Sequence, residues 1–452
     1  MTVRINPRRF TGTFKIPASK SHTIRQLLIA SLADGETEIK DPLDSLDTQS
    51  CLAACKAFGA GITERRDGDK IIGWRVIGNN GFKNHCASVS TCEPPVIDVG
   101  NSGTTLYLAL AIAGLQSQPI KFTGDEQIQK RSAAPLLDAL ARLGVQVQSS
   151  QQAGNSGCVP VTIKGPWKGG KVNLPCPTSQ YLSALLIASP LAPAGTVTEI
   201  NVPLLNEKPY IEMTLSYLTA HGIPFEANWP GHFVIPGGAS WKAVSADSAR
   251  SVPADFSSAA FPAAAAAITG GPVTLLSLSP EDTQGDKFFI EILKSMGCEV
   301  NWSEDLQNNK SKTLTISREG ILRGGSFDLN ETPDLLPAAA VTAAYAEGDT
   351  VFRNVAHARI KETDRIAVMA QELVKLGVRC TELPDGLIVH GKGGLFPEGL
   401  PSSDYIPEIN GHGDHRIVMA FAVAALGSPV PVEITTAESA AVTYPGFLEL
   451  LA

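Results

Sequence analysis

Six copies of one segment type occur at nearly even spacing along the chain. Each begins with a short polar cluster, continues with small apolar residues and ends at a glycine. The copies begin near Ser21, Ser102, Ser179, Ser257, Asp334 and His415 and end near Gly35, Gly114, Gly195, Gly270, Gly348 and Gly427. Subtracting successive starts gives steps of about 81, 77, 78, 77 and 81 residues. This period exceeds that of the common solenoid repeats, so we expect six copies of one larger supersecondary unit.

Each unit is predicted to contain two helices and several strands. Ser, Thr and Asp cap helix starts and glycine closes helix ends, so each copy should open with a helix. A second helical pattern follows in five units, before Gly59 and at 136–144, 211–222, 288–297 and 366–377. Two short apolar strands come next, as at 145–147 and 159–163 or at 378–381 and 387–390. The pattern predicts an α/β fold of β-α-β-α-β-β units.

The first helix of each unit should be buried on every side. Segments 259–268 and 338–346 are rich in alanine and nearly apolar all round, whereas the second helices carry a polar face. No apolar run reaches the roughly 18 residues of a spanning helix. Residues 1–18 contain four basic residues and no apolar stretch typical of a signal peptide. We therefore expect a cytoplasmic protein with no membrane partner.

The length of the chain favours two domains, since single cores seldom grow beyond about 250 to 300 residues. Six units divide most simply into three and three, and the proline-containing stretches 17–19 and 251–253 bracket three of them. We predict one domain at 20–252 and a discontinuous one at 1–19 and 253–452. The two crossings would form a hinge.

Charge and cysteine usage exclude several classes of partner. The formal charge is −8 and no basic run with interleaved aromatic residues occurs, so a nucleic-acid partner is not expected. The eight cysteines are irregularly placed, as expected for reduced thiols. Neither Cys51 with Cys55 nor the group His85, Cys86 and Cys92 gives a closed ligand set for zinc. We expect no metal site.

The polar starts of the repeated helices are candidate anion sites, because free backbone N–H groups and the helix dipole favour anions there. Lys20, Ser21 and Arg25 lie at the first start, where they could hold a phosphate or simply cap a solvated helix. The other candidate groups are Thr178-Ser179-Gln180, Lys208-Pro209-Tyr210, Asp334, Arg359 to Arg365 and Gly413-Asp414-His415-Arg416. Equivalent positions in similar units predict that these residues converge in one cleft between the domains.

Seven short strings together resemble one known family. They are S-K-S around Lys20, G-N-S-G-T around Gly103, T-S-Q around Ser179, K-P-Y-I around Tyr210, Q-G-D at Asp286, K-E-T-D-R at Glu362 and D-H-R at His415. In this order, over almost the whole chain, they are similar to the 5-enolpyruvylshikimate-3-phosphate (EPSP) synthases. Each string alone is weak evidence for the family, but seven strings in the same order are a highly specific match.

The resemblance implies two similar domains of three units each, as inside-out α/β barrels with buried helices and a double-crossover hinge. It implies transfer of the enolpyruvyl group of phosphoenolpyruvate to the 5-hydroxyl of shikimate 3-phosphate, with release of phosphate, on the pathway to chorismate and the aromatic amino acids. No metal or organic cofactor is implied, since cations of the protein neutralise the phosphates. We expect a monomer whose cleft closes on shikimate 3-phosphate.

The resemblance also implies roles for individual residues. Those expected around shikimate 3-phosphate are Ser21, Arg25, Thr178, Ser179, Gln180, Tyr210 and Asp334. Those expected to hold phosphoenolpyruvate or line its site are Lys20, Gly103, Arg131, Arg365, His415 and Arg416, and Lys361 is a further substrate-binding candidate. Asp334 and Glu362 are the acid and base candidates, and Lys20 could shuttle a proton. Which carboxylate performs which step stays open.

Three positions depart from the family pattern. Many members have arginine where this chain has Tyr107, serine where it has Glu207, and some have lysine where it has Val442. A neutral phenol replaces a bidentate cation at Tyr107. The carboxylate of Glu207 would repel a nearby phosphate unless it points away or pairs with a cation such as Lys208. These changes bear on rate, affinity and glyphosate sensitivity.

Four alternatives remain open on the sequence. A related transferase acts on UDP-N-acetylglucosamine and uses a loop cysteine, but 124–131 contains none. RNA 3′-terminal phosphate cyclase shares related units, but neither its histidine signature nor a basic surface occurs. A catalytically impaired relative could bind a phosphorylated metabolite as a sensor, although retention of Lys20, Asp334 and Glu362 argues against it. His412 and His415 are spaced as metal ligands could be, but the match at His415 favours substrate contact.

Overall fold

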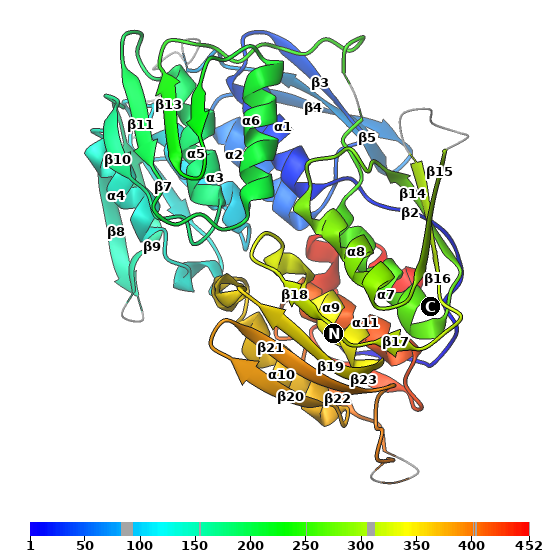
Figure 1. Cartoon of the computed structure of the whole chain (residues 1–452). Coiled ribbons are helices and arrows are strands. Elements are labelled where there is room, and N and C mark those ends of the chain that lie inside the picture. The colour runs from blue at the N-terminus through cyan, green and yellow to red at the C-terminus, as the bar shows by residue number, and fades with distance from the viewer. Residues whose placement is uncertain are drawn as a thin grey trace. The chain divides into compact units, whose positions relative to one another are not determined.

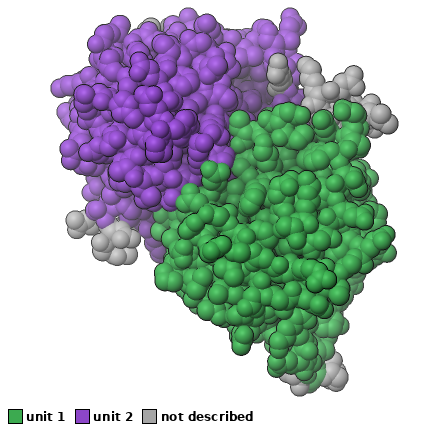
Figure 2. Space-filling view, in the orientation of Figure 1, with its two compact units in different colours: residues 1–19, 253–452 green, residues 20–252 purple. Residues whose placement is uncertain are grey.

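The computed structural model describes residues 1–82, 94–152, 155–249, 251–304, 312–400, 402 and 405–451. The chain divides into two compact units (Figure 2). Unit 1 contains Met1–Ser19 and Pro253–Ala452, and unit 2 contains Lys20–Val252. The helices and strands of both are labelled in Figure 1.

Unit 2 contains three sheets within the described ranges. Their strands are β3 (Glu36–Lys40), β4 (Gly61–Asp67) and β5 (Lys70–Ile77); β6 (Val96–Asp98), β7 (Ile120–Thr123), β8 (Gln146–Gln152) and β9 (Asn155–Lys164); and β10 (Gly170–Asn173), β11 (Val197–Asn201), β12 (Glu226–Asn228) and β13 (His232–Pro236). The second and third sheets have equivalent orders, β6-β7-β9-β8 and β10-β11-β13-β12, with the first pair parallel and the others antiparallel. Segments of one topology therefore recur along the chain.

The helices of unit 2 fall into two classes. The first helices of the repeats are α1 (Lys20–Leu32), α3 (Gly103–Ala113) and α5 (Gln180–Ala188). Every residue of α3, and all of α5 after Gln180, is buried. The second helices are α2 (Leu46–Ala57), α4 (Ala134–Arg142) and α6 (Lys208–Ala220), and each buries only part of its surface. The predicted contrast between buried and half-exposed helices is confirmed.

Unit 1 repeats this pattern in its described part. One sheet joins β2 (Gly12–Lys15), β14 (Val273–Leu278), β16 (Lys312–Ser317) and β15 (Glu299–Glu304). A second sheet contains β17 (Leu322–Arg323), β18 (Ser326–Asp328), β19 (Ala346–Arg353), β21 (Gly386–Lys392) and β20 (Arg379–Leu383). The third contains β22 (Glu408–Ile409), β23 (Val432–Ile434) and β1 (Val3–Ile5). The N-terminal strand β1 thus pairs with β23, from the end of the chain.

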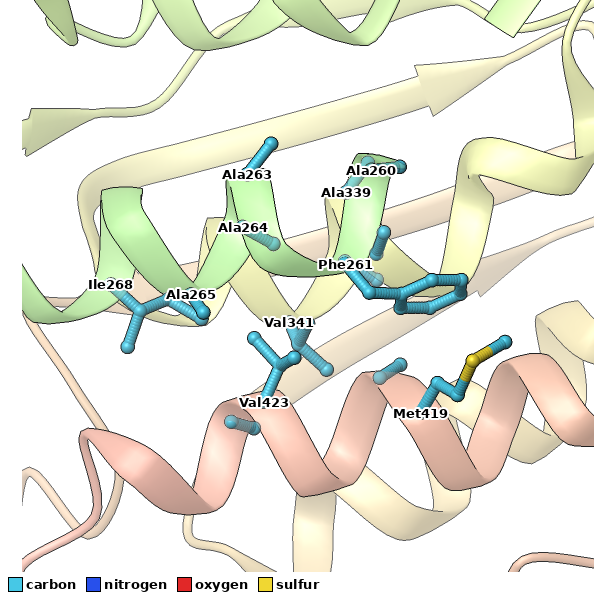
Figure 3. Close-up of a cluster of buried hydrophobic side chains, with 14 of the residues drawn as sticks. Ala260, Phe261, Ala263, Ala264, Ala265, Ile268, Ala339, Val341, Met419 and Val423 are labelled. Carbon is cyan, nitrogen blue, oxygen red and sulfur yellow. The ribbon is translucent and has the colours of Figure 1, made fainter. Parts of the chain in front are cut away.

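The core of unit 1 forms where three buried helices meet. These are α7 (Phe256–Thr269), α9 (Leu336–Ala344) and α11 (His415–Leu426), which pack on one another. Their small side chains allow close approach, and the larger Phe261, Val341, Met419 and Val423 fill the space between them (Figure 3). Helices α8 (Phe288–Ser295) and α10 (Arg365–Lys375) bury one face each, and a short α12 (Phe447–Leu450) ends the chain.

The predicted α/β fold is confirmed, with local differences. Helix α7 is capped by Asp255, whose side chain accepts a hydrogen bond from the Ser258 N–H, so this helix begins at Phe256, one residue before the predicted start near Ser257. Gly348 lies inside β19, because the last residues of the apolar run continue as a strand instead of a helix. Nowhere in the described ranges is a helix both long and apolar enough to cross a bilayer.

Candidate active site

In unit 2, polar side chains gather at the N-terminal ends of the buried helices. Lys20 is the first residue of α1, and its Nζ lies 3.0 Å from Oδ2 of Asp47, in the first turn of α2. Both side chains are largely buried, so this ion pair holds the ammonium at a fixed position. Asp47 is a site residue that sequence reasoning missed, because nothing in the sequence pairs these two helix starts.

The buried side chain of Arg25, on α1, links three helices of unit 2 by hydrogen bonds. Its Nε donates to Thr214 Oγ1 on α6 at 2.9 Å, and its Nη2 donates to Ser183 Oγ on α5 at 3.1 Å. Further bonds reach the backbone carbonyls of Ser21 and Tyr210. Burial lowers the pKa of Arg25 to about 10, against smaller opposing effects of Tyr217, Tyr210 and Glu207. The guanidinium therefore brings together Ser21 and Tyr210, two predicted site residues.

Gly103 lies against two other predicted site residues. A Cβ added to Gly103 would lie 3.0 Å from Nη1 of Arg131 and 3.8 Å from Oε1 of Gln180. Arg131 Nη2 also donates to Oδ1 of Asn101 at 2.9 Å, just before α3. The lack of a side chain at Gly103 therefore leaves room for the Arg131 guanidinium. The N-terminal ends of α3 and α5 and the turn at 128–131 lie close together around Gly103.

Tyr107 lies one turn into α3, on the same side as Gly103. Its Cε2 would be 3.6 Å from the Cβ of a residue at 103, and its ring meets that of Tyr181 edge to face at 5.0 Å between centroids. Tyr181 donates its hydroxyl to the carbonyl of Ser132 at 2.6 Å, and burial raises the pKa of this phenol well above its usual value. The rings of Tyr107 and Tyr181 thus pack on each other beside Gly103.

The Thr178-Ser179 pair precedes α5 and is bound to an acidic residue. Oε2 of Glu207 accepts hydrogen bonds from Ser179 Oγ at 2.8 Å, Ser179 N at 3.0 Å and Thr178 Oγ1 at 3.2 Å. Glu207 is only 2% exposed. The carboxylate therefore points toward these donors and does not lie in solvent.

In unit 1, a second cluster forms around Arg365, the first residue of α10. Its guanidinium is 1% exposed and donates to three carboxylates. Nη1 reaches Asp334 Oδ1 at 2.8 Å, Nη2 reaches Glu362 Oε2, and Nε reaches Asp414 Oδ2 at 2.9 Å. These contacts raise the pKa of Arg365 against the opposing effect of burial, so it stays charged.

Asp334, in the short helix η4 (Pro333–Leu335), is held by further cations. Arg416 Nη2 donates to its Oδ2 at 3.0 Å, and Lys361 Nζ lies 3.8 Å from its Oδ1. Burial alone would raise the pKa of Asp334, but Arg416, Lys361 and Arg365 outweigh that effect and hold it well below its usual range. Asp334 is therefore an ionised acceptor at neutral pH.

Asp414 connects α10 with the start of α11. It caps α11 by accepting a hydrogen bond from the Arg416 N–H at 2.9 Å, and it also accepts one from Thr363 Oγ1 at 3.0 Å. His415 follows it and is buried, with Nδ1 4.0 Å from Asp414 Oδ1. Sequence reasoning missed this role of Asp414, although its place directly before His415 and Arg416 is typical of a helix cap.

Asp286 is a buried carboxyl in unit 1 that sequence reasoning quoted only as part of a motif. It lies in the short helix η3 (Gly285–Lys287) and accepts a hydrogen bond from the hydroxyl of Ser257. Burial, and next the negative charge of Asp334, raise its pKa to about 7. The pKa values of Asp286 and Asp334, both in unit 1, are therefore shifted in opposite directions.

The described residues include no group of three or more His, Cys, Asp or Glu arranged to hold a metal ion. The sequence group His85, Cys86 and Cys92 lies outside the described residues.

Val442, one of the three positions that depart from the expected pattern, is half-buried at the end of the short helix η6 (Ala437–Val442).

Comparison with known proteins gives one consistent result. A family model described as EPSP synthase (3-phosphoshikimate 1-carboxyvinyltransferase) matches residues 5–451. The 3-phosphoshikimate 1-carboxyvinyltransferase of Acetivibrio thermocellus is 40% identical over 452 residues, covering 100% of this chain and 97% of that protein. The enzyme of that name from Methanothermobacter thermautotrophicus is 38% identical, with 97% of this chain and 94% of that protein covered. A solved EPSP synthase from Acinetobacter baumannii superposes with a TM-score of 0.78 at 29% identity, covering 99% of this chain and 97% of that one.

Proposed function

The chain belongs to the EPSP synthase (3-phosphoshikimate 1-carboxyvinyltransferase) family, and on that basis we propose how its own residues carry out the family's reaction. The enzyme transfers the enolpyruvyl group of phosphoenolpyruvate to the 5-hydroxyl of shikimate 3-phosphate and releases phosphate, in the shikimate pathway. The comparisons favour this reaction over a UDP-sugar acceptor or an impaired binding protein.

One observation carries the assignment of the chemistry: Asp334 and Glu362 bind the same buried guanidinium, that of Arg365. The reaction needs a group that accepts the proton of the attacking hydroxyl and a group that protonates the methylene carbon of phosphoenolpyruvate. Asp334 is kept ionised by Arg416, Lys361 and Arg365, so its oxygens can accept first a hydrogen bond and then the proton of the hydroxyl. We assign it to the hydroxyl, and Glu362 to the methylene carbon.

The reaction then runs by addition and elimination. The 5-hydroxyl gives its proton to Asp334 as its oxygen bonds to C2 of phosphoenolpyruvate, while C3 takes a proton from Glu362, which gives a tetrahedral adduct. Glu362 then takes a proton back from C3, the bond from C2 to the phosphate oxygen breaks, and phosphate leaves with the proton held by Asp334, so that the enolpyruvyl ether remains. Lys20, held by Asp47, and Arg131 and Arg416 supply positive charge for the phosphate and carboxylate of the donor.

The acceptor is assigned to residues of unit 2 and to Asp334. Ser21, Thr178, Ser179, Gln180 and Tyr210 offer hydroxyl and amide groups, and Arg25 offers the charge that a phosphate needs. Lys361, Arg365 and His415 complete the set of substrate-binding residues. The reaction needs no cofactor on this account, since every proton and charge is handled by side chains.

We further propose that the protein acts as a monomer in the cytoplasm. The described cysteines Cys51, Cys55, Cys158, Cys176, Cys298 and Cys380 are free thiols, and all but Cys380 are buried, which suits a reducing compartment. Light scattering on the purified protein tests the first point, and fractionation of the source cells tests the second.

The experiment that tests the function measures phosphate release with both substrates present and with each omitted in turn. Release that requires both supports the transferase. Release with UDP-N-acetylglucosamine but not with shikimate 3-phosphate would favour the related transferase instead. Binding of shikimate 3-phosphate without any release would favour the impaired relative.

A further inference from the structure

Glu207 occupies a set of hydrogen-bond donors that has the form of an anion site. Three donors from two consecutive residues, the Ser179 N–H and the hydroxyls of Ser179 and Thr178, converge on one carboxylate oxygen at 2.8 to 3.2 Å. They lie at the start of α5, which runs nine residues from Gln180. A free backbone N–H at a helix start together with hydroxyl donors is suited to phosphate as well as to carboxylate.

The backbone just before Glu207 is hydrogen-bonded to the segment that precedes α5. Asn206 donates from its backbone N to the carbonyl of Cys176 and from Nδ2 to the carbonyl of Pro177, both at 3.2 Å. Leu205 pairs with Cys176 in a parallel bridge. Glu207 itself has φ of 58°, a left-handed conformation that costs a non-glycine residue free energy. Rotation of the Glu207 side chain would free the donors without breaking these backbone contacts.

The charge of Glu207 also acts on Arg25. Burial lowers the pKa of Arg25, and the charge of Glu207 is among the smaller effects that oppose this. Arg25 is the buried cation that the proposed function assigns to the phosphate of the acceptor.

On the basis of the proposed function, we propose that Glu207 is a specificity-determining residue that competes with the phosphate group of the acceptor for the hydrogen-bond donors of Thr178 and Ser179. Shikimate 3-phosphate binds when the side chain of Glu207 turns away from these donors. The competition lowers the affinity for shikimate 3-phosphate but not for unphosphorylated shikimate. The protein therefore distinguishes less strongly between the two ligands by affinity. A serine at this position would remove the competing charge and add a hydroxyl donor.

Calorimetric binding of shikimate 3-phosphate and of shikimate to the full chain tests this inference, with Glu207→Ser compared with wild type. We expect the Kd for shikimate 3-phosphate to fall at least about tenfold, because a charged competitor for three hydrogen bonds is gone. The Kd for shikimate should change less than about twofold. Glu212→Gln is the matched control, since Glu212 lies on the same helix, is 45% exposed and pairs only with Lys208 among the described ion pairs.

An unchanged or higher Kd for shikimate 3-phosphate in Glu207→Ser would overturn the inference, as would an equal gain for both ligands. Glutamine has the shape of glutamate without its charge. If Glu207→Ser does not fold, the Kd of Glu207→Gln for shikimate 3-phosphate therefore tests the inference instead. We expect this variant to bind shikimate 3-phosphate several-fold more tightly, and no change would overturn the inference. Absence of binding to every variant would also overturn it.

Phosphate release by the wild type separates this inference from the proposed function. Tighter binding in the variants without turnover in any of them would leave Glu207 as a competitor and contradict the transferase assignment. Turnover in the wild type with unchanged Kd values in both variants would support the transferase assignment and overturn the inference about Glu207.

Discussion

Arg365 binds both carboxylate oxygens of Asp414, from Nε at 2.9 Å and from Nη2 at 3.2 Å, and both side chains are almost fully buried. Since the same guanidinium also contacts Asp334 and Glu362, the bond to Asp414 fixes the position of both proposed catalytic carboxylates. Asp414 caps α11 as well, so one side chain orients the reacting groups and stabilises the helix that carries His415 and Arg416.

Removal of Asp414 should destabilise the protein strongly. Asp414→Asn leaves the buried guanidinium with less negative charge, and breaking a buried pair costs about 3 to 5 kcal/mol. Unfolding in urea measures this loss. Asp364→Ala removes the side-chain cap of α10, and since the Asp364 side chain is 39% exposed, the loss should cost only about 1 kcal/mol. Equal losses in the two variants would contradict the role given to Asp414.

Glu362→Gln should lower kcat by at least about 100-fold while the protein stays folded, because the amide cannot transfer a proton. Steady-state phosphate release measures kcat, and circular dichroism checks the fold. The control is Glu291→Gln on α8, an exposed residue that pairs with Lys294. A variant that keeps more than a tenth of the wild-type kcat would exclude Glu362 as the acid.

Gly103→Ala should raise the KM for phosphoenolpyruvate several-fold with little change in the KM for shikimate 3-phosphate. The new methyl group would lie 3.0 Å from Nη1 of Arg131 and displace a guanidinium assigned to the donor. Gly320→Ala places a methyl group in open space and should leave both constants unchanged. A rise in the KM for shikimate 3-phosphate alone would contradict the assignment of Arg131.

Asp286 should make the protein less stable as pH rises from about 4 to 7. Its pKa in the folded protein is about 7, because burial and the charge of Asp334 raise it, whereas an unfolded Asp has a pKa of about 3.9. Between these values the unfolded chain has lost the proton that the folded protein still holds, so stability falls with pH and levels off above the folded pKa. Asp286→Asn mimics the protonated form and removes this effect.

Urea unfolding of wild type and Asp286→Asn at several pH values measures this difference. The stability of the variant relative to wild type should increase between pH 4 and 7 and then stay constant. The exposed Asp138→Asn serves as the control and should show no such trend. A constant difference between wild type and Asp286→Asn over the whole range would exclude a raised pKa.

The repeating units were predictable because they depend on local signals. Alanine-rich runs after polar starts mark the buried helices, and α3, α9 and α11 are buried along their whole length, as expected. The strands that follow α4 and α10 also form where alternating apolar residues predict them. Gly348 was wrongly predicted to end a helix, because a glycine after an apolar run can also lie within a strand. Here the chain passes from α9 directly into β19, which contains Gly348.

The ion partners in the site were not predictable from sequence. The pairs of Lys20 with Asp47 and of Arg365 with Asp414 join residues that lie 27 and 49 positions apart, and they depend on how the helices pack. The convergence of the two clusters in one cleft stays a prediction, as do the hinge and its closure on shikimate 3-phosphate. Glu207 was expected to repel a phosphate, but its bonds to Thr178 and Ser179 could only be seen in the structure.

The most direct test of the proposed chemistry is mass spectrometry of the organic product after incubation of the protein with phosphoenolpyruvate and shikimate 3-phosphate, with phosphate measured in the same sample. The account predicts shikimate 3-phosphate in which one enolpyruvyl group replaces a hydroxyl proton, with one phosphate released per product. Recovery of unchanged shikimate 3-phosphate, or of pyruvate and phosphate without the enolpyruvyl ether, would contradict it.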